Sequence, residues 1–184
     1  MGPVDKASKE YSLDIYGFSS AKRASKMDGI AVSIEPAVQT EVASLLAQSD
    51  AVAAMLYPGE YRRSITAESL ARPDSHVLIA RIAGKAVGLC VLFDRADQTM
   101  ELKRMIVDGG SRGMGIGVAL LRGAEAQALH FGAHTLLLEV GTRNSEAQRL
   151  YRRGGYQPCE PFPPYTATPI SLFMRRSLRV GLAH

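Results

Sequence analysis

Three glycines at alternate positions, Gly113, Gly115 and Gly117, stand between two segments of opposite periodicity. The segment before them, TMELKRMIVD, alternates apolar and polar residues and predicts a strand over residues 99–108. The segment after them predicts an amphipathic helix that ends near Phe131, with an apolar face of Val118, Leu121, Ala124, Ala128 and Leu129. Glycine destabilises a helix by about 1 kcal/mol relative to alanine, so this cluster needs a reason other than helix formation.

A glycine-rich turn at the start of a helix predicts a phosphate-binding site. The N-terminus of a helix has unpaired backbone N–H groups and carries about half a positive charge, and missing side chains let phosphate oxygens approach. Arg112 adds a cation beside the turn. A Rossmann fingerprint would need glycine in place of Val118, and a P-loop would need Gly-Lys followed by Ser or Thr, so neither motif fits.

The rest of the chain predicts an α/β fold of the α+β type, in which a mixed, mostly antiparallel central sheet is flanked by helices. Further strands are predicted in GIAVSIEPA, HTLLLEV and PISLFMRRSL, and HVLIARIAGKAVGLCVLF predicts a hairpin that turns at Gly84-Lys85. Helices are predicted in QTEVASLLAQSDAVAAMLY and in NSEAQRLYRRGGY. Asn144 is positioned to cap the second of these, and Gly154 and Gly155 to end it.

Composition favours a single domain. The chain has 184 residues, of which 46% are hydrophobic, enough for one core over residues 29–181. Residues 1–28 are expected to form a flexible leader. No apolar run approaches the ~20 residues of a membrane span, and no secretory signal is evident, so we expect a cytoplasmic protein without membrane attachment.

The net charge of +4 suits an anionic ligand. The alternative is a nucleic-acid arm in the basic leader, but no Lys/Arg run is interleaved with aromatic residues, and we expect no nucleic-acid partner. Cys90 and Cys159 have neither C-x-x-C spacing nor clustered histidines, so we expect buried or idle thiols and no metal site.

The run Arg112-Gly113-Met114-Gly115-Ile116-Gly117 fits the pattern Arg/Gln-x-x-Gly-x-Gly/Ala and resembles the signature of the GNAT family of N-acetyltransferases. In that family this loop holds the pyrophosphate of acetyl-coenzyme A. MELKRMIVD, HTLLLEVGTRN and NSEAQRLYRRGGYQP resemble, in order, the fourth strand, the fifth strand and the following helix of small bacterial members. The resemblance covers about residues 30–179 and implies the GNAT acyl-CoA N-acyltransferase fold.

The resemblance also implies a set of residues that bind the acyl donor. The pantetheine arm is expected where the fourth and fifth strands separate, and the backbone amide near Met105 is expected to polarise the thioester carbonyl. The implied donor-binding residues are Met105, Ile106, Val107, Arg112, Gly113, Met114, Gly115, Ile116, Gly117, Asn144 and Ala147. Asn144 has two interpretations, helix cap and donor contact, which are compatible.

Acetyl transfer to an amine needs a base and an acid. An alkyl ammonium with a pKa near ~10.4 leaves about one molecule in a thousand or fewer neutral at pH 7, so a base must accept a proton. The resemblance gives this role to Glu101, with an ion pair to Lys103 as the alternative and Glu139 as a second candidate carboxylate. It gives Tyr151 the role of acid toward the coenzyme A sulfur, with a structural core tyrosine as the alternative.

The acceptor-binding groups are expected in two parts of the chain. By resemblance, acceptor-binding groups are expected at Tyr57, Glu60, Tyr61 and Arg62, after the first helix, and at Phe162 and Tyr165 near the last strands. We expect a primary amine of a small molecule or a peptide as the acceptor, and a homodimer that pairs through the last strands. The alternative is a GNAT-fold module that binds coenzyme A for regulation without turnover.

Overall fold

The computed structural model describes residues 29–59 and 64–178. These residues contain one seven-stranded sheet with the strand order β1-β2-β3-β4-β5-β7-β6. The predicted leader lies outside these residues. The strands are β1 (Ile30–Glu35), β2 (Ser75–Ile82), β3 (Lys85–Asp94), β4 (Thr99–Val107), β5 (Thr135–Gly141), β6 (Gln157–Pro158) and β7 (Ser171–Ser177). The α-helices are α1 (Thr40–Leu56), α2 (Ile116–His130) and α3 (Ser145–Arg153), and Glu68–Leu70 and Gly109–Ser111 are short 3₁₀ turns. Neighbouring strands are antiparallel except β4 and β5, which are parallel, as predicted for a mixed, mostly antiparallel sheet.

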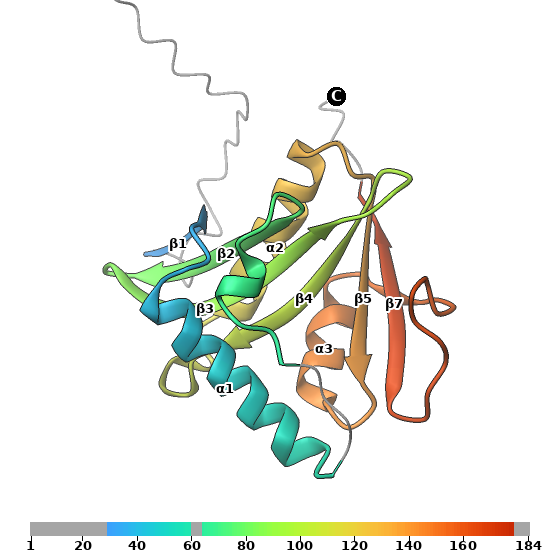
Figure 1. Ribbon diagram of the computed structural model, residues 1–184, viewed down its shortest axis with the longest axis horizontal. Helices are drawn as coiled ribbons and strands as arrows, with labels where there is room; N and C mark the ends of the chain where they lie inside the picture. The colour runs from blue at the N-terminus through green and yellow to red at the C-terminus, as the bar shows by residue number, and fades with distance from the viewer. Residues whose placement is uncertain (1–28, 60–63, 179–184) are drawn as a thin grey trace, which may run out of the picture.

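Helices cover both faces of this sheet (Figure 1). On one face α1 packs through Val42, Leu45 and Leu46 against apolar residues of β2, β3 and β4. On the other face α2 packs through residues such as Leu120 and Ala124, and Tyr151 of α3 joins the same core. The predicted apolar face of α2 is wrong at Val118, which is 38% exposed and lines a cavity instead of packing in the core.

A bulge in β4 changes which side chains face which helix. Leu89 of β3 pairs with Ile106, but Val91 pairs with Lys103, so β4 has one extra residue at this point. Arg104 adopts a positive φ of 54° there and forms an ion pair with Asp50 of α1. Because the bulge breaks the period of two, Met105 packs on the α2 face while Lys103 stays on the opposite one.

The parallel pair of β4 and β5 opens toward the carboxyl ends of its strands. Backbone pairing runs from Thr99 with Thr135 to Leu102 with Leu138 and stops there. Figure 1 shows the two strands diverging beyond this point, with α3 beside the opening. We call this opening the β4–β5 split. It exposes strand backbone that a central strand would otherwise pair.

Three details differ from the predictions. The hairpin of β2 and β3 turns at Ala83 and Gly84, with φ of 47° and 81°, so Lys85 already belongs to β3. The short strand β6 follows α3 and was too short to give a periodic signal. The nearly continuous apolar run of β5 is typical of a strand buried on both faces, but β5 is buried only on the α2 face, and Glu139 on the other is exposed.

Candidate active site

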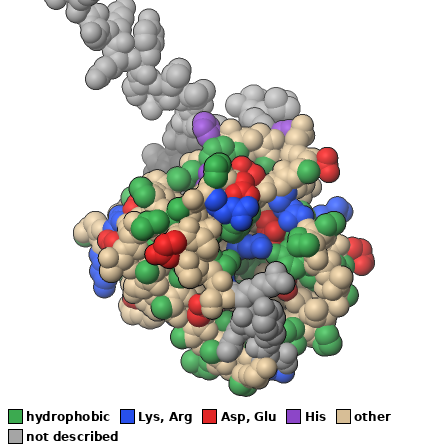
Figure 2. All heavy atoms as spheres, viewed as in Figure 1, with side chains coloured by type: hydrophobic (Ala, Val, Ile, Leu, Met, Phe, Trp, Pro, Cys, Tyr) green, Lys and Arg blue, Asp and Glu red, His purple; other side chains and the backbone are tan. Residues whose placement is uncertain are grey.

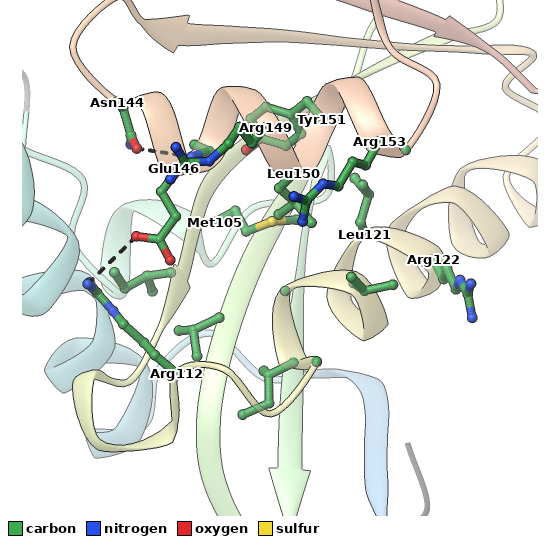
Figure 3. A pocket seen from close by; sticks show the side chains of 18 of the residues that line it. Met105, Arg112, Leu121, Arg122, Asn144, Glu146, Arg149, Leu150, Tyr151 and Arg153 are labelled. Atoms are coloured by element: carbon green, nitrogen blue, oxygen red, sulfur yellow. Dashed lines mark hydrogen bonds and ion pairs between the residues drawn. The ribbon is translucent and has the colours of Figure 1, made fainter. Parts of the chain in front are cut away.

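A cavity of about 1010 Å³ lies where β4, α2 and α3 meet at the split. It brings together segments that are distant in the chain, and nearly all of the predicted donor-binding residues line it. These are Met105, Ile106, Val107, Arg112, Gly113, Gly115, Ile116, Gly117, Asn144 and Ala147. Met114 is the exception, since its side chain is 47% exposed and does not line the cavity. Figure 3 shows Met105, Leu121 and Leu150 meeting at its centre.

The three alternate glycines have two different physical roles. Gly113 and Gly115 adopt positive φ angles of 78° and 85°, a conformation that costs little only for glycine. Gly117 is inside α2, and a Cβ there would come within 3.3 Å of Cδ2 of Leu150 on α3. The first two glycines therefore permit the turn, and the third lets Leu150 of α3 approach α2 closely at the cavity.

The cavity is electropositive. Its lining includes five arginines, Arg112, Arg122, Arg149, Arg153 and Arg176, and two glutamates, Glu125 and Glu146. Gly115 is the N-cap of α2 and offers no side-chain cap, so the first-turn N–H groups remain available to a ligand. Together with the helix dipole, this arrangement favours an anion with several charges.

Two ion pairs organise the cavity lining. Nη1 of Arg112 lies 3.8 Å from Oε2 of Glu146, across the cavity from the glycine turn to α3 (Figure 3). Nη1 of Arg176 lies 2.6 Å from Oε1 of Glu125, whose pKa is raised because the carboxyl is buried.

Of the five lining arginines, the sequence analysis predicted only Arg112 as a donor-binding residue. The repeat of Arg149 and Arg153 four residues apart was the available signal, since that spacing places both on one helix face.

Tyr151 lies in the lining of the cavity and is only 7% exposed. Burial raises the pKa of its hydroxyl, so the protonated form persists well above neutral pH. The ring packs against that of Tyr156, with centroids 5.7 Å apart. Tyr151 is therefore a core residue that also lines the cavity, and its role as an acid stays a prediction.

Asn144 caps α3 as predicted. Its Oδ1 accepts a hydrogen bond of 3.1 Å from the backbone N–H of Ala147, and both residues line the cavity. Gly154 is the C-cap, and Gly155 follows with a φ of 85°. The cap fixes the start of α3 at the cavity edge, which positions Tyr151 two turns later.

Glu101 lies outside the cavity lining, in the register rung just before the last one that joins β4 to β5. It is 2% exposed and accepts hydrogen bonds from Tyr165 at 2.6 Å and from Arg95 at 3.0 Å. Nζ of Lys103 lies 3.4 Å from its Oε1, so the predicted ion pair is present. A carboxylate offers about four acceptor positions, and three donors leave one for a further partner.

The predicted acceptor residues fall into different surroundings. Tyr165 contacts Glu101, and burial and this hydrogen bond raise the pKa of its hydroxyl. Phe162 is buried and packs edge to face on Tyr165, with centroids 5.2 Å apart. Tyr57 is buried where α1 ends, and its hydroxyl oxygen accepts a 2.7 Å hydrogen bond from the N–H of Arg143. The remaining predicted acceptor residues, Glu60, Tyr61 and Arg62, lie outside the described residues.

The second candidate carboxylate, Glu139, is exposed on β5 and accepts a hydrogen bond from the hydroxyl of Ser171.

Cys90 is fully buried in the core, and this burial raises the pKa of its thiol, which disfavours a nucleophilic thiolate. Cys159 is half-buried. Within residues 29–59 and 64–178, no cluster of three metal-ligating side chains is found. Among the described helices, none is long and apolar enough to cross a bilayer.

Comparison with known proteins gives a consistent result. The family model described as the acetyltransferase (GNAT) family matches residues 44–156. An IAA acetyltransferase of Azospirillum brasilense is 35% identical over 153 residues, which are 83% of this chain and 100% of the relative. The crystal structure of a candidate acyl-CoA N-acyltransferase from Klebsiella pneumoniae is 31% identical, with a TM-score of 0.71 over 82% of this chain and 98% of that one.

A structure with acetyl-CoA bound shares the fold. It is a GNAT family acetyltransferase from Elizabethkingia anophelis, with a TM-score of 0.63 and 16% identity over 82% of this chain and 99% of that one.

Proposed function

The chain belongs to the acetyltransferase (GNAT) family and is an N-acetyltransferase, and from this premise we propose that acetyl-coenzyme A is its donor and a primary amine its acceptor. The observation that carries the proposal is the cavity at the β4–β5 split. It combines an uncapped helix N-terminus, an excess of arginine, and a buried tyrosine in one lining. We also propose a cytoplasmic location and a homodimer, as the sequence predicts.

The cavity fits the chemistry of a coenzyme A thioester. Its pyrophosphate needs donors and positive charge, which the first turn of α2 and the lining arginines supply. Its pantetheine arm carries amides, and β4 beyond Leu102 offers unpaired strand backbone to such groups.

The reaction joins the amine nitrogen to the thioester carbonyl carbon. The new N–C bond forms, the C–S bond breaks, and its electron pair leaves with sulfur. In the proposed mechanism Glu101 accepts the proton that the amine loses, directly or through water, and Tyr151 protonates the departing sulfur. The backbone N–H near Met105 stabilises the oxyanion of the tetrahedral intermediate. The products are an N-acetyl amide and coenzyme A thiol.

Direct attack in a ternary complex is favoured over a cysteine intermediate. The one thiol near the site, that of Cys90, is buried in the core, and Tyr151 lies close enough to it that the two groups interact. Cys90 is absent from the cavity lining. An acyl-cysteine there would need the core to open.

Calorimetric titration of acetyl-coenzyme A tests the proposal. Gly117→Asp places a carboxylate in the cavity but suits the first turn of a helix, so the protein should fold while donor affinity falls at least tenfold. Ser44→Asp, on the exposed side of α1, is the matched charge control and should bind normally. Equal binding by all three proteins would refute the proposed donor site. Release of free thiol with a panel of amines then measures turnover.

A further inference from the structure

Opposite charges stand on the two sides of the β4–β5 split. Lys103 and Glu139 are the first residues after the last paired rung, Leu102 with Leu138, on β4 and β5 respectively. The cluster of Glu101, Lys103, Glu139 and Tyr165 lies on the sheet face opposite α2, and we call it the acceptor cluster. Figure 2 shows this face, where basic and acidic side chains gather around a hollow near its middle.

We propose that the acceptor is a small amine that also carries an anionic group, such as a carboxylate, and that Lys103 binds this group. The proposal rests on the proposed function and names the substrate class of that site. It makes Lys103 a specificity-determining residue, a role that the sequence did not suggest.

The ammonium of Lys103 is held in place by contacts that leave N–H donors available for a ligand. Its Nζ lies 3.4 Å from Oε1 of Glu101, 5.3 Å from the ring centroid of Phe93 and 5.2 Å from that of Tyr165. Two aromatic faces and one carboxylate therefore fix the ammonium. Its side chain remains 32% exposed, and an ammonium has three donors, so it can donate to a ligand while keeping the bond to Glu101.

Arg95 has less capacity for a ligand. It donates to Oε2 of Glu101 and to the carbonyl of Pro163, and its guanidinium lies 5.0 Å from the ring centroid of Phe162. These contacts commit both terminal nitrogens to groups of the protein. Between the two cations beside Glu101, Lys103 is therefore the one placed to bind an anion.

The charge balance of the cluster favours an acceptor with both signs. Arg95 and Lys103 already compensate Glu101, so two cations surround one buried carboxylate. A simple ammonium would approach a positive group at β4. Glu139 on β5 is exposed and can attract the ammonium to the split, where Glu101 accepts its proton, while Lys103 receives an anion. A molecule with one amine and one nearby anionic group matches both sides of the split.

Paired substrates test this inference. The panel consists of the proteinogenic amino acids, 2-aminoethylphosphonate, and the amines of the same skeletons without the anionic group, with coenzyme A release as the readout. We expect wild type to show a kcat/KM about 10- to 100-fold higher for the anionic member of a pair. In Lys103→Met, which keeps an apolar stem over the rings, the preference should vanish. In Lys103→Arg it should persist in part.

The outcomes separate the two claims. Equal rates within pairs, a preference for the uncharged amine, or a preference retained in Lys103→Met would overturn the inference while leaving acetyl transfer intact. Acetylation of no panel member by a wild type that binds acetyl-coenzyme A would also overturn it. Failure to bind acetyl-coenzyme A would instead overturn the proposed function. Donor titration of Lys103→Met should match wild type, because Lys103 does not line the donor cavity.

Discussion

The hydroxyl of Tyr165 donates a 2.6 Å hydrogen bond to Oε1 of Glu101, although 64 residues separate them in the chain. This bond joins the loop before β7 to the β4 side of the split. It orients the carboxylate that we propose as the base, and it leaves one acceptor position open among the partners that surround it.

Glu101→Gln should lower kcat about 100-fold or more, because an amide of the same size cannot accept the proton of the amine. Donor affinity should not change, since Glu101 lies outside the donor cavity. Steady-state kinetics and calorimetry on the same preparation measure both. Tyr165→Phe, which removes one hydrogen bond but keeps the carboxylate, is the matched control and should lose less. A kcat for Glu101→Gln near that of wild type would assign Glu101 a structural role.

Tyr151→Phe should lower kcat about 100-fold while preserving donor affinity, because the ring still fills its place in the core. Burial raises the pKa of Tyr151, so the acid form persists through the accessible range. The wild-type rate should therefore rise with pH up to about pH 10 as the amine loses its proton, without a fall caused by ionisation of Tyr151. A fall in rate between pH 8 and 9 that disappears in Tyr151→Phe would contradict this assignment.

Gly141→Ala should destabilise the protein by about 1–3 kcal/mol. A Cβ at this position would come within 2.0 Å of the Tyr57 hydroxyl oxygen, so the ring must move. Thermal or urea unfolding measures the change. Gly109→Ala is the control, since a Cβ there meets nothing within 4 Å. In Tyr57→Leu the added cost of Gly141→Ala should shrink; an unchanged cost would show that the clash with Tyr57 is not the cause.

Glu35→Gln should lower the melting temperature at pH 7 and have a smaller effect in acid. Nε and Nη2 of Arg81 donate to the two carboxylate oxygens of Glu35 at 2.8 and 2.7 Å, and this hydrogen bonding lowers the pKa of Glu35. A lowered pKa means that the stabilisation is complete above the unfolded value of about 4.3 and is lost as pH falls through the folded value. Melting curves from pH 7 to pH 3 should show the two proteins converging. A constant difference would contradict the assignment.

Much of the fold was predictable because short-range patterns of apolar and polar residues determine which segments form strands and helices. Alternation in residues 99–108 and helical spacing after Gly117 fixed the order of strands and helices. The glycine turn predicted an anion site because the helix N-terminus needs no tertiary partner to attract anions. The capping role of Asn144 was likewise local, since it depends on residues three apart.

Local patterns could not predict contacts made by a bulge or by distant residues. The extra residue in β4 at Arg104 reverses the alternation, so Met105 faces the donor cavity and Lys103 the opposite side. The hydrophobic periodicity of the sequence does not predict such a bulge, because contacts with neighbouring elements stabilise it, here the ion pair of Arg104 with Asp50 of α1. Arg176 of β7 was missed because only the folded sheet brings it to the cavity.

The sequence by itself determined the family, the order of elements and the chemistry of the glycine turn, because each depends on residues close together in the chain. Only the tertiary structure decided the surroundings of Glu101. Its burial and its partners Arg95, Lys103 and Tyr165 come from the register of β3 and β4 and from the loop that reaches over from β7. The charge around a carboxylate depends on distances in space, and the packing of the sheet sets those distances.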